Sequence, residues 1–162
     1  MIILGIDPGF GRIGWGLIKD ERGKQSLINY DCIETNPNIK LEARIAHIFK
    51  DITAIIRKHK PSTIASEELF FGTNVTTALS VGQARGVIML AAYQNQIPTY
   101  LYKPVEIKMA VTGYGSASKA QIQKMVKLIL KLDSIPKPDD AADALAIALT
   151  HCYSQKMKGI KT

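Results

Sequence analysis

The sequence predicts a mixed α/β fold in which a five-stranded sheet carries helices on both faces. Three segments with strand-like alternation open the chain and are separated only by turns, which is typical of an antiparallel meander. Two shorter apolar segments, 63–68 and 99–102, alternate with segments of helical periodicity, which favours parallel strands. The chain has 162 residues, the length of one such domain.

The meander is expected to consist of three strands, over residues 1–7, 13–19 and 26–34. Pro8-Gly9 and Glu21-Arg22-Gly23 supply the turns between them, because these residue types are typical of tight turns. Strand, turn, strand, turn, strand is the pattern of a sheet built by neighbours in the chain.

Two helices are predicted on either side of the fourth strand. From Leu41 to Ile56, apolar side chains recur at three- and four-residue intervals, and Pro61 ends this helix. The segment 75–94 is apolar or small around much of its circumference, which is typical of a helix buried on two sides. One side can face the sheet and the other a second subunit, which predicts a homodimer; a helix buried inside one chain fits the same pattern.

The third long helix is predicted to begin at Ser118, after a short helical turn that follows Pro104. Ser118-x-x-Gln121 is a capping box, in which each end residue binds the backbone N–H of the other. The apolar face of this helix lies opposite a lysine face that consists of Lys124, Lys127 and Lys131.

The last helix is expected to begin at Asp139 or Asp140 and to end near Tyr153. No repeat, linker or low-complexity segment divides the chain. We therefore expect one domain over residues 1–155 and a short basic tail over residues 156–162.

The composition suits either a polyanionic partner or an acidic membrane surface. The chain has 21 Lys and Arg against 14 Asp and Glu, a formal net charge of +7. Its longest apolar run is residues 87–93, too short to span a membrane, and no basic leader opens the chain. Cys32 and Cys152 form no disulfide framework and no zinc motif, so both are expected to be reduced in a cytoplasmic protein.

The carboxylates carry the functional signal. Asp7 ends the first apolar strand, and Asp140 and Asp143 lie three residues apart on one helix face. Asp140 can cap that helix, but Asp143 would point into the protein and therefore needs a cation beside it. Glu67 or Glu68 can join Asp7, because neighbouring strand residues face opposite ways.

Together these acids predict a metal-dependent nuclease. Oxygen-rich clusters select Mg²⁺ or Mn²⁺ over zinc or copper. Two such ions about 3.5–4 Å apart can activate a water and stabilise the leaving oxygen of a phosphodiester. His151 lies two turns beyond the acids on the last helix and is a weaker candidate for a supporting role.

Five groups of residues, in order along the chain, together resemble the RuvC-type Holliday junction resolvases. They are Gly5-Ile-Asp-Pro-Gly9, Glu67-x-x-Phe70 before Asn74, Gly82-Gln-Ala-Arg-Gly86, Lys108 followed by Gly113-x-Gly115-x-Ala117-x-Lys119-x-Gln121, and Asp140-Ala-Ala-Asp143-Ala-Leu-Ala. The resemblance covers nearly the whole chain. It implies an RNase-H-like fold and a homodimer that resolves four-way DNA junctions by symmetric nicks in strands of like polarity, in recombination and repair.

The resemblance also implies roles for individual residues. Its catalytic, metal-binding acids correspond to Asp7, Glu67, Asp140 and Asp143, and its catalytic lysines to Lys108 and Lys119. Phe70 corresponds to an aromatic that stacks on bases at the opened junction, and Asn74, Arg85 and both lysines are expected to contact DNA. The implied cofactor is Mg²⁺, replaceable by Mn²⁺, with two ions in each site. A RuvAB-type branch-migration complex is the implied partner.

Three other interpretations fit parts of the pattern. Arg12-Ile13-Gly14 also occurs in YqgF-type nucleases, which lack the Asp-Ala-Ala-Asp helix. An actin-like ATPase would need a second Asp-x-Gly loop, and an inactive junction-binding protein would be expected to have lost part of the acidic set. Phe71, beside Phe70, is a departure from the family pattern with no assigned role, and Ser66 stands where a branched apolar residue is usual.

Overall fold

The computed structural model describes the backbone of residues 1–68 and 75–159 and the side chains of residues 1–68 and 78–155. Its strands are Ile2–Asp7 (β1), Arg12–Glu21 (β2), Lys24–Glu34 (β3), Thr63–Glu67 (β4) and Thr99–Tyr102 (β5). Its helices are Leu41–His59 (α1), Val75–Gln94 (α2), Pro104–Thr112 (α3), Lys119–Ile129 (α4) and Asp139–Gly159 (α5).

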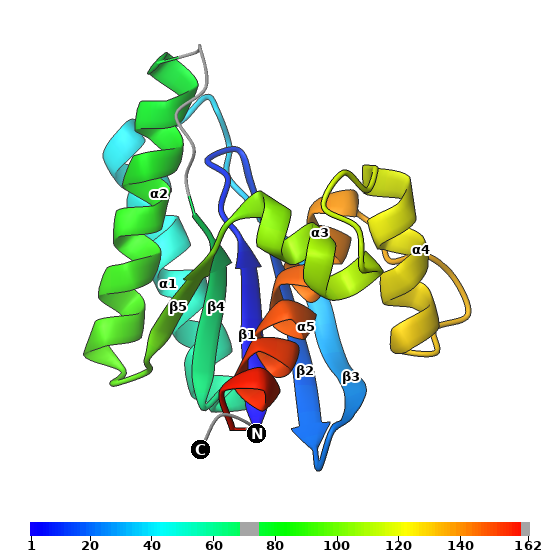
Figure 1. Ribbon diagram of the computed structural model, residues 1–162. Coiled ribbons are helices and arrows are strands. Elements are labelled where there is room, and N and C mark those ends of the chain that lie inside the picture. Colours follow the sequence, from blue (N-terminus) through cyan, green and yellow to red (C-terminus); the bar gives the residue numbers. More distant parts are fainter. Residues whose placement is uncertain (69–74, 160–162) are drawn as a thin grey trace.

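The strands form one sheet in the order β3-β2-β1-β4-β5. β1 pairs with β2, and β2 with β3, in antiparallel register, which confirms the predicted meander. β4 pairs with β1, and β5 with β4, in parallel register. Helices α3, α4 and α5 lie on one face of the sheet and α1 and α2 on the other (Figure 1), so the predicted mixed sheet with helices on both faces is confirmed.

The β2–β3 hairpin is longer than predicted because its turn is shorter. Only Arg22 and Gly23 separate the two strands, and both have positive φ angles, of 49° and 88°. Such two-residue turns match the right-handed twist of the flanking strands, so pairing continues up to Glu21 and Lys24. The side chain of Asp20 accepts a hydrogen bond from the Gly23 N–H, at 3.1 Å.

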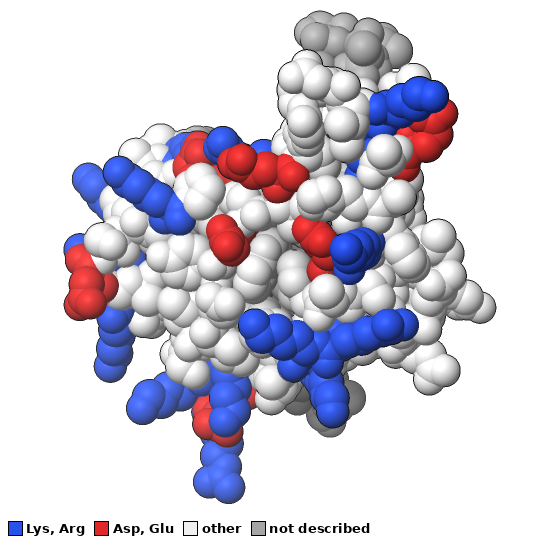
Figure 2. Space-filling view, turned by 180° about the vertical axis from the view of Figure 1, so that it is seen from behind, with Lys and Arg blue, Asp and Glu red and all other residues white. Residues whose placement is uncertain are grey.

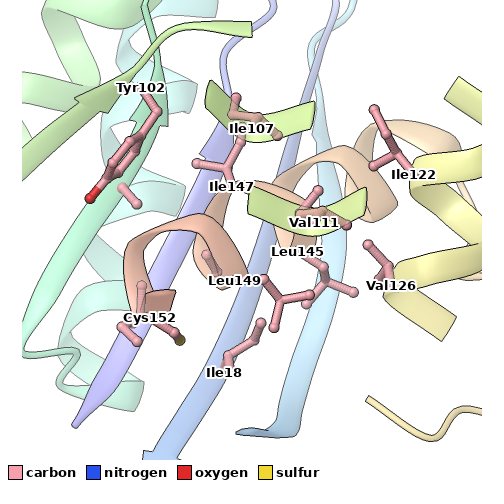
Figure 3. Close-up of a cluster of buried hydrophobic side chains, with 14 of the residues drawn as sticks. Ile18, Tyr102, Ile107, Val111, Ile122, Val126, Leu145, Ile147, Leu149 and Cys152 are labelled. Atoms are coloured by element: carbon pink, nitrogen blue, oxygen red, sulfur yellow. The ribbon is translucent and has the colours of Figure 1, made fainter. Parts of the chain in front are cut away.

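Two apolar clusters fill the space between the sheet and its helices. On the α5 face, side chains of the sheet, α3, α4 and α5 interdigitate (Figure 3), and Val126, Leu145 and Leu149 are buried. On the other face, α1 contributes Ile48 and Ile52, and α2 contributes Ile88 and three alanines. Helix α5 is covered on both sides, by the sheet and by α3 and α4, which explains its nearly continuous run of alanine and leucine.

Glycines in the sheet let α5 approach the strands at backbone distance. A Cβ atom at Gly5 would overlap the carbonyl oxygen of Ala144, and one at Gly14 would overlap the carbonyl oxygen of Asp140. The first turns of α5 therefore lie directly on β1 and β2. This contact brings the acids of α5 to the edge of the sheet where β1 ends.

The start of α4 lies where the sequence predicted it, whereas the end of α5 lies beyond its predicted position. The Gln121 N–H donates to Ser118 Oγ at 3.3 Å and the Ser118 N–H to Gln121 Oε1 at 2.7 Å, which confirms the capping box. Helix α5 continues to Gly159, past the predicted end near Tyr153, because no proline or glycine interrupts it earlier. Among the described residues, none of the helices combines the length and apolarity that crossing a membrane requires.

Helix α2 has a buried side and an exposed apolar side. Ala84 and Ile88 face the core, whereas the exposed fractions of Leu79 and Tyr93 are 64% and 82%. The interpretation that this helix is buried inside a single chain is therefore wrong. Its outer face is available to another molecule.

Candidate active site

Asp7 and Glu67 lie side by side at one edge of the sheet. β1 and β4 are parallel neighbours in which Ile6 pairs with Ser66, so both strands end in their acidic residue at the same level. Strand alternation directs both residues to the α5 face, together with Ala65 of the apolar cluster under that helix. Ser66 lies on the opposite side of β4, and so does Glu68 by the same alternation. The choice that the strand pattern left open falls on Glu67.

Asp143, in the first turns of α5, has the cation that its position requires. Lys119, the first residue of α4, places its Nζ 2.8 Å from Asp143 Oδ2 and 2.6 Å from Asp139 Oδ2. The side chain of Asp143 is 26% exposed, so an unpaired charge there would be costly. The expectation of a cation beside Asp143 is confirmed, and the cation is Lys119.

Asp140 has a different partner. Arg12, at the start of β2, places Nη1 3.3 Å from Asp140 Oδ2 and Nε 3.1 Å from Glu34 Oε1. Sequence reasoning assigned no role to Arg12. Its position three residues after the Asp7-Pro8-Gly9 turn was the available signal, since that turn brings the start of β2 to the edge where Asp7 lies.

A pocket of about 230 Å³ opens between α3, α4, α5 and the ends of the strands. Its polar lining consists of Asp7, Glu67, Lys108, Lys119 and Asp143. Its apolar lining consists of Pro104, Ile107, Ile122, Ala146 and Ile147. Five of the six predicted catalytic residues thus line one pocket; the sixth, Asp140, lies beside it in the ion pair with Arg12.

The acids of the pocket resist ionisation. Burial, followed by the charges of Asp143, Glu67 and Asp140, raises the pKa of Asp7 to about 7. Burial also raises the pKa of Glu67 and of Asp143, each with a neighbouring carboxylate as a further cause. Although burial favours the neutral amine, hydrogen bonds to Asp139 and Asp143 raise the pKa of Lys119, which stays charged.

Burial, and after it the mutual repulsion of the carboxylates, raises these pKa values, and a bound cation would offset both. The donor atoms are carboxylate oxygens, which suit a hard divalent cation such as Mg²⁺. In the described ranges 1–68 and 75–159, no three Asp, Glu, His or Cys side chains converge closely enough to form a ready ligand group. The carboxylate oxygens fit a hard cation by their chemistry, and Lys119 is the cation that the structure places beside Asp143.

The remaining predicted residues are placed as follows. Phe70 and Asn74 lie outside the described residues, as does Phe71. Arg85 is half-buried on α2, and its Nε has no hydrogen-bond partner in the described part of the chain. His151 does not line the pocket: it is buried in the core, with Nδ1 2.7 Å from the hydroxyl of Tyr102.

The chain matches known proteins over almost its full length. A family model described as crossover junction endodeoxyribonuclease RuvC matches residues 3–151. The protein of that name from Rubrobacter xylanophilus is 47% identical over 156 residues, which are 96% of this chain and 87% of that protein. The one from Chloroflexus aurantiacus is 50% identical over 154 residues, covering 95% of this chain and 94% of that protein.

Solved structures agree with this match. The structure of Thermus thermophilus RuvC in complex with Holliday junction substrate has a TM-score of 0.94 and 34% sequence identity, and covers 98% of this chain and 96% of that chain. The yeast mitochondrial Holliday junction resolvase Ydc2, at 16% identity and a TM-score of 0.70, shares the RNase-H-like fold. The chain belongs to the crossover junction endodeoxyribonuclease RuvC family.

Proposed function

We propose that this protein is an endonuclease that resolves four-way DNA junctions by paired, metal-dependent nicks in strands of like polarity, during recombination and repair. The observation that carries the proposal is the pocket in which three carboxylates and two lysines meet at the end of β1. Membership of the RuvC family, a family of metal-dependent nucleases, supplies the reaction class. The junction substrate bound by the Thermus thermophilus relative supplies the DNA structure.

Asp7, Glu67, Asp140 and Asp143 are proposed to hold Mg²⁺, or Mn²⁺ in its place, as two ions in each site. Bound ions of this kind supply Lewis acidity to a phosphodiester and a nucleophilic water at neutral pH. Support comes from Asp7, whose pKa is raised first by burial and then by the charges of three neighbouring carboxylates, effects that a cation would offset. Loading a cation would release the proton that Asp7 holds at neutral pH.

The two lysines are proposed to have different tasks. Lys119 is bound to Asp139 and Asp143, so it orients the acids of α5 and neutralises part of their charge. No described carboxylate lies within ion-pair distance of Lys108, which lines the same pocket and has its ammonium available for the scissile phosphate. Charge placed where the pentacovalent phosphate develops lowers the barrier of the chemical step.

Three further residues are proposed to contact the junction. Phe70 and Asn74, which lie outside the described residues, come three and seven residues after Glu67, the last residue of β4. Phe70 would stack on an exposed base, a contact that tolerates any sequence. Arg85, half-buried on α2, would bind a phosphate.

The active form is proposed to be a homodimer joined through α2. The outer face of α2 presents four exposed apolar side chains: Leu79, Met89, Leu90 and Tyr93. A Cβ at Gly82 or Gly86 would meet open space, so a second helix could approach closely there. Two active sites related by twofold symmetry would account for two nicks in strands of like polarity.

The proposed setting follows from the family. We place the enzyme in the bacterial cytoplasm, with a RuvAB-type branch-migration complex as partner. Residues 1–155 are proposed as the nuclease domain and 156–162 as a basic tail.

The test is nicking of a synthetic four-way junction, against a linear duplex of the same sequence, in Mg²⁺ and in EDTA. Paired nicks confined to the junction and dependent on the ion are the expected result. Junction binding without nicking, over a set of junction sequences and in both Mg²⁺ and Mn²⁺, would contradict the proposal and identify a binding protein. Equal cutting of both substrates would remove the selectivity for junctions.

A further inference from the structure

Helix α4 presents a row of lysines on its exposed side. Ile122, Val126 and Leu130 are buried against α3 and α5, which fixes how α4 is rotated. The exposed Lys124 and the half-buried Lys127 then lie on the side of α4 that also exposes Ala120. Lys131 follows directly after the last turn of the helix.

This row is a concentration of uncompensated positive charge. Residues 119–131 contain four lysines and no aspartate or glutamate. Lys119 is paired with Asp139 and Asp143. Within the part of the chain that the structure describes, no carboxylate lies within ion-pair distance of Lys124, Lys127 or Lys131.

The row starts at the nuclease pocket. Lys119 is both the first residue of α4 and part of the pocket lining. At about 1.5 Å per residue, α4 is about 15 Å long from Lys119 to Ile129, and Lys131 lies two residues further, so the row extends up to about 18 Å from Lys119. Because a duplex rises about 3.4 Å per base pair, the row spans about five base pairs.

We propose that Lys124, Lys127 and Lys131 bind backbone phosphates of the junction arm that leaves the active site, within about five base pairs of the scissile phosphate. The inference rests on the proposed function. Continuity with the nuclease pocket favours DNA over an acidic protein, since DNA seated on Lys108 and Lys119 passes the head of α4. The row would hold the arm in position without reading its sequence.

The experiment compares two triple variants that remove the same charge. One carries Lys124→Gln, Lys127→Gln and Lys131→Gln. The matched control carries Lys24→Gln, Lys58→Gln and Lys60→Gln, exposed positions at the β2–β3 turn and the end of α1, where β1 begins rather than ends. Figure 2 shows lysine and arginine side chains at the lower end of the molecule, the end where β1 begins in Figure 1. The control therefore removes the same net charge as the α4 variant, but from a different position.

Binding of a labelled four-way junction is measured in EDTA, to prevent cleavage, over a series of salt concentrations. Each lost phosphate contact lowers the slope of log K against log salt by about 0.9, so the α4 variant should lose about 2.7. Its Kd at about 0.1 M salt should rise by at least about tenfold. The control variant should keep a slope close to that of the wild type.

A second measurement locates the contacts on the DNA. Neutral methylphosphonate linkages are placed three to five nucleotides from the scissile phosphate. They should weaken binding by the wild-type protein and the control variant, and have little further effect on the α4 variant, because both changes remove the same contact.

If the slope of log K against log salt is the same for the α4 variant and the wild type, the proposal is overturned. An acidic protein surface would then be the alternative partner for the row. Fully additive effects of the methylphosphonates and the α4 substitutions would overturn the assignment to this arm. Failure of the proposed function looks different: the wild-type protein itself would then fail to nick or to prefer the junction. Circular dichroism of each variant confirms that the changes act on folded protein.

Discussion

The two faces of the sheet differ in how their helices pack and in the side chains that they expose. On the α5 face, the helix lies on glycines at backbone distance, and the packed layer ends in carboxylates with raised pKa values. On the face of α1 and α2, apolar side chains fill the contact, and the outer side of α2 stays apolar and exposed. Under the proposed function, this difference would separate catalysis from assembly across the sheet: one face concentrates charge at the end of β1, and the other exposes an apolar surface on α2.

The largest expected effect tests whether nicking depends on the carboxylates of the α5 face in particular. Glu67→Gln should lower the single-turnover rate of junction nicking by about 10²–10³-fold or more, because it removes a carboxylate from the pocket. The matched variant Glu68→Gln changes the next residue along, on the other side of the chain, and should nick at nearly the wild-type rate. Similar losses in both would contradict the assignment of Glu67. Nicking of a saturated junction provides the measurement.

The second prediction tests the other face. Tyr93→Asp combined with Leu79→Asp places charge on the outer side of α2 and should convert a dimer of two 17.8 kDa chains into a monomer. Light scattering measures the mass, and the fraction of junctions nicked in both strands should fall with it. Ile28→Asp, an exposed apolar position on β3 at the far edge of the sheet, is the control. A wild-type mass for the α2 variant would break the proposed division between the faces.

The third prediction concerns how the buried Asp7 lowers the free energy of unfolding at neutral pH. The pKa of Asp7 lies at about 7, above its ordinary value of 3.8, so the folded protein binds this proton more tightly than the unfolded chain does. The free energy of unfolding therefore falls as pH rises from about 4 to about 7. Asp7→Asn should abolish this fall, which is on the order of 2–4 kcal/mol of the free energy of unfolding above about pH 7.

Urea unfolding in EDTA measures this effect. The Asn variant should be more stable than the wild type at about pH 8 and equally stable at about pH 4. Addition of Mg²⁺ at the higher pH should stabilise the wild type far more than the variant, because the cation supplies the missing charge. A stability difference that does not change with pH would show that the carboxylate of Asp7 is already compensated.

The smallest expected effect tests the close contact of α5 with the strands. Gly14→Ala should lower the free energy of unfolding by about 1–3 kcal/mol, because the added methyl group meets the carbonyl of Asp140 and moves α5 outward. Gly11→Ala meets no atom within 4 Å and is the control. If both variants are equally stable, backbone contact is not what positions the acids of α5.

Much of the molecule follows from local patterns in the sequence. Alternation and turn residues predict β1, β2 and β3, and the capping box predicts the start of α4, because these depend on neighbours within a few residues. Burial of Asp143 within the first turns of α5 is also readable, since helical periodicity places it on the apolar face. The resemblance to the family also named all the polar residues of the pocket from the sequence alone.

The tertiary structure decided what local patterns leave open. Lys119 is the cation beside Asp143 because α4 packs against α5, and Arg12 reaches Asp140 across 128 residues of chain. Glu67 and not Glu68 joins Asp7 because the parallel register of β4 and the position of α5 determine which side of that strand faces the pocket. The physical reason is range: hydrogen bonding and periodicity act along a few residues, whereas charge pairing and burial depend on which distant segments the core brings into contact.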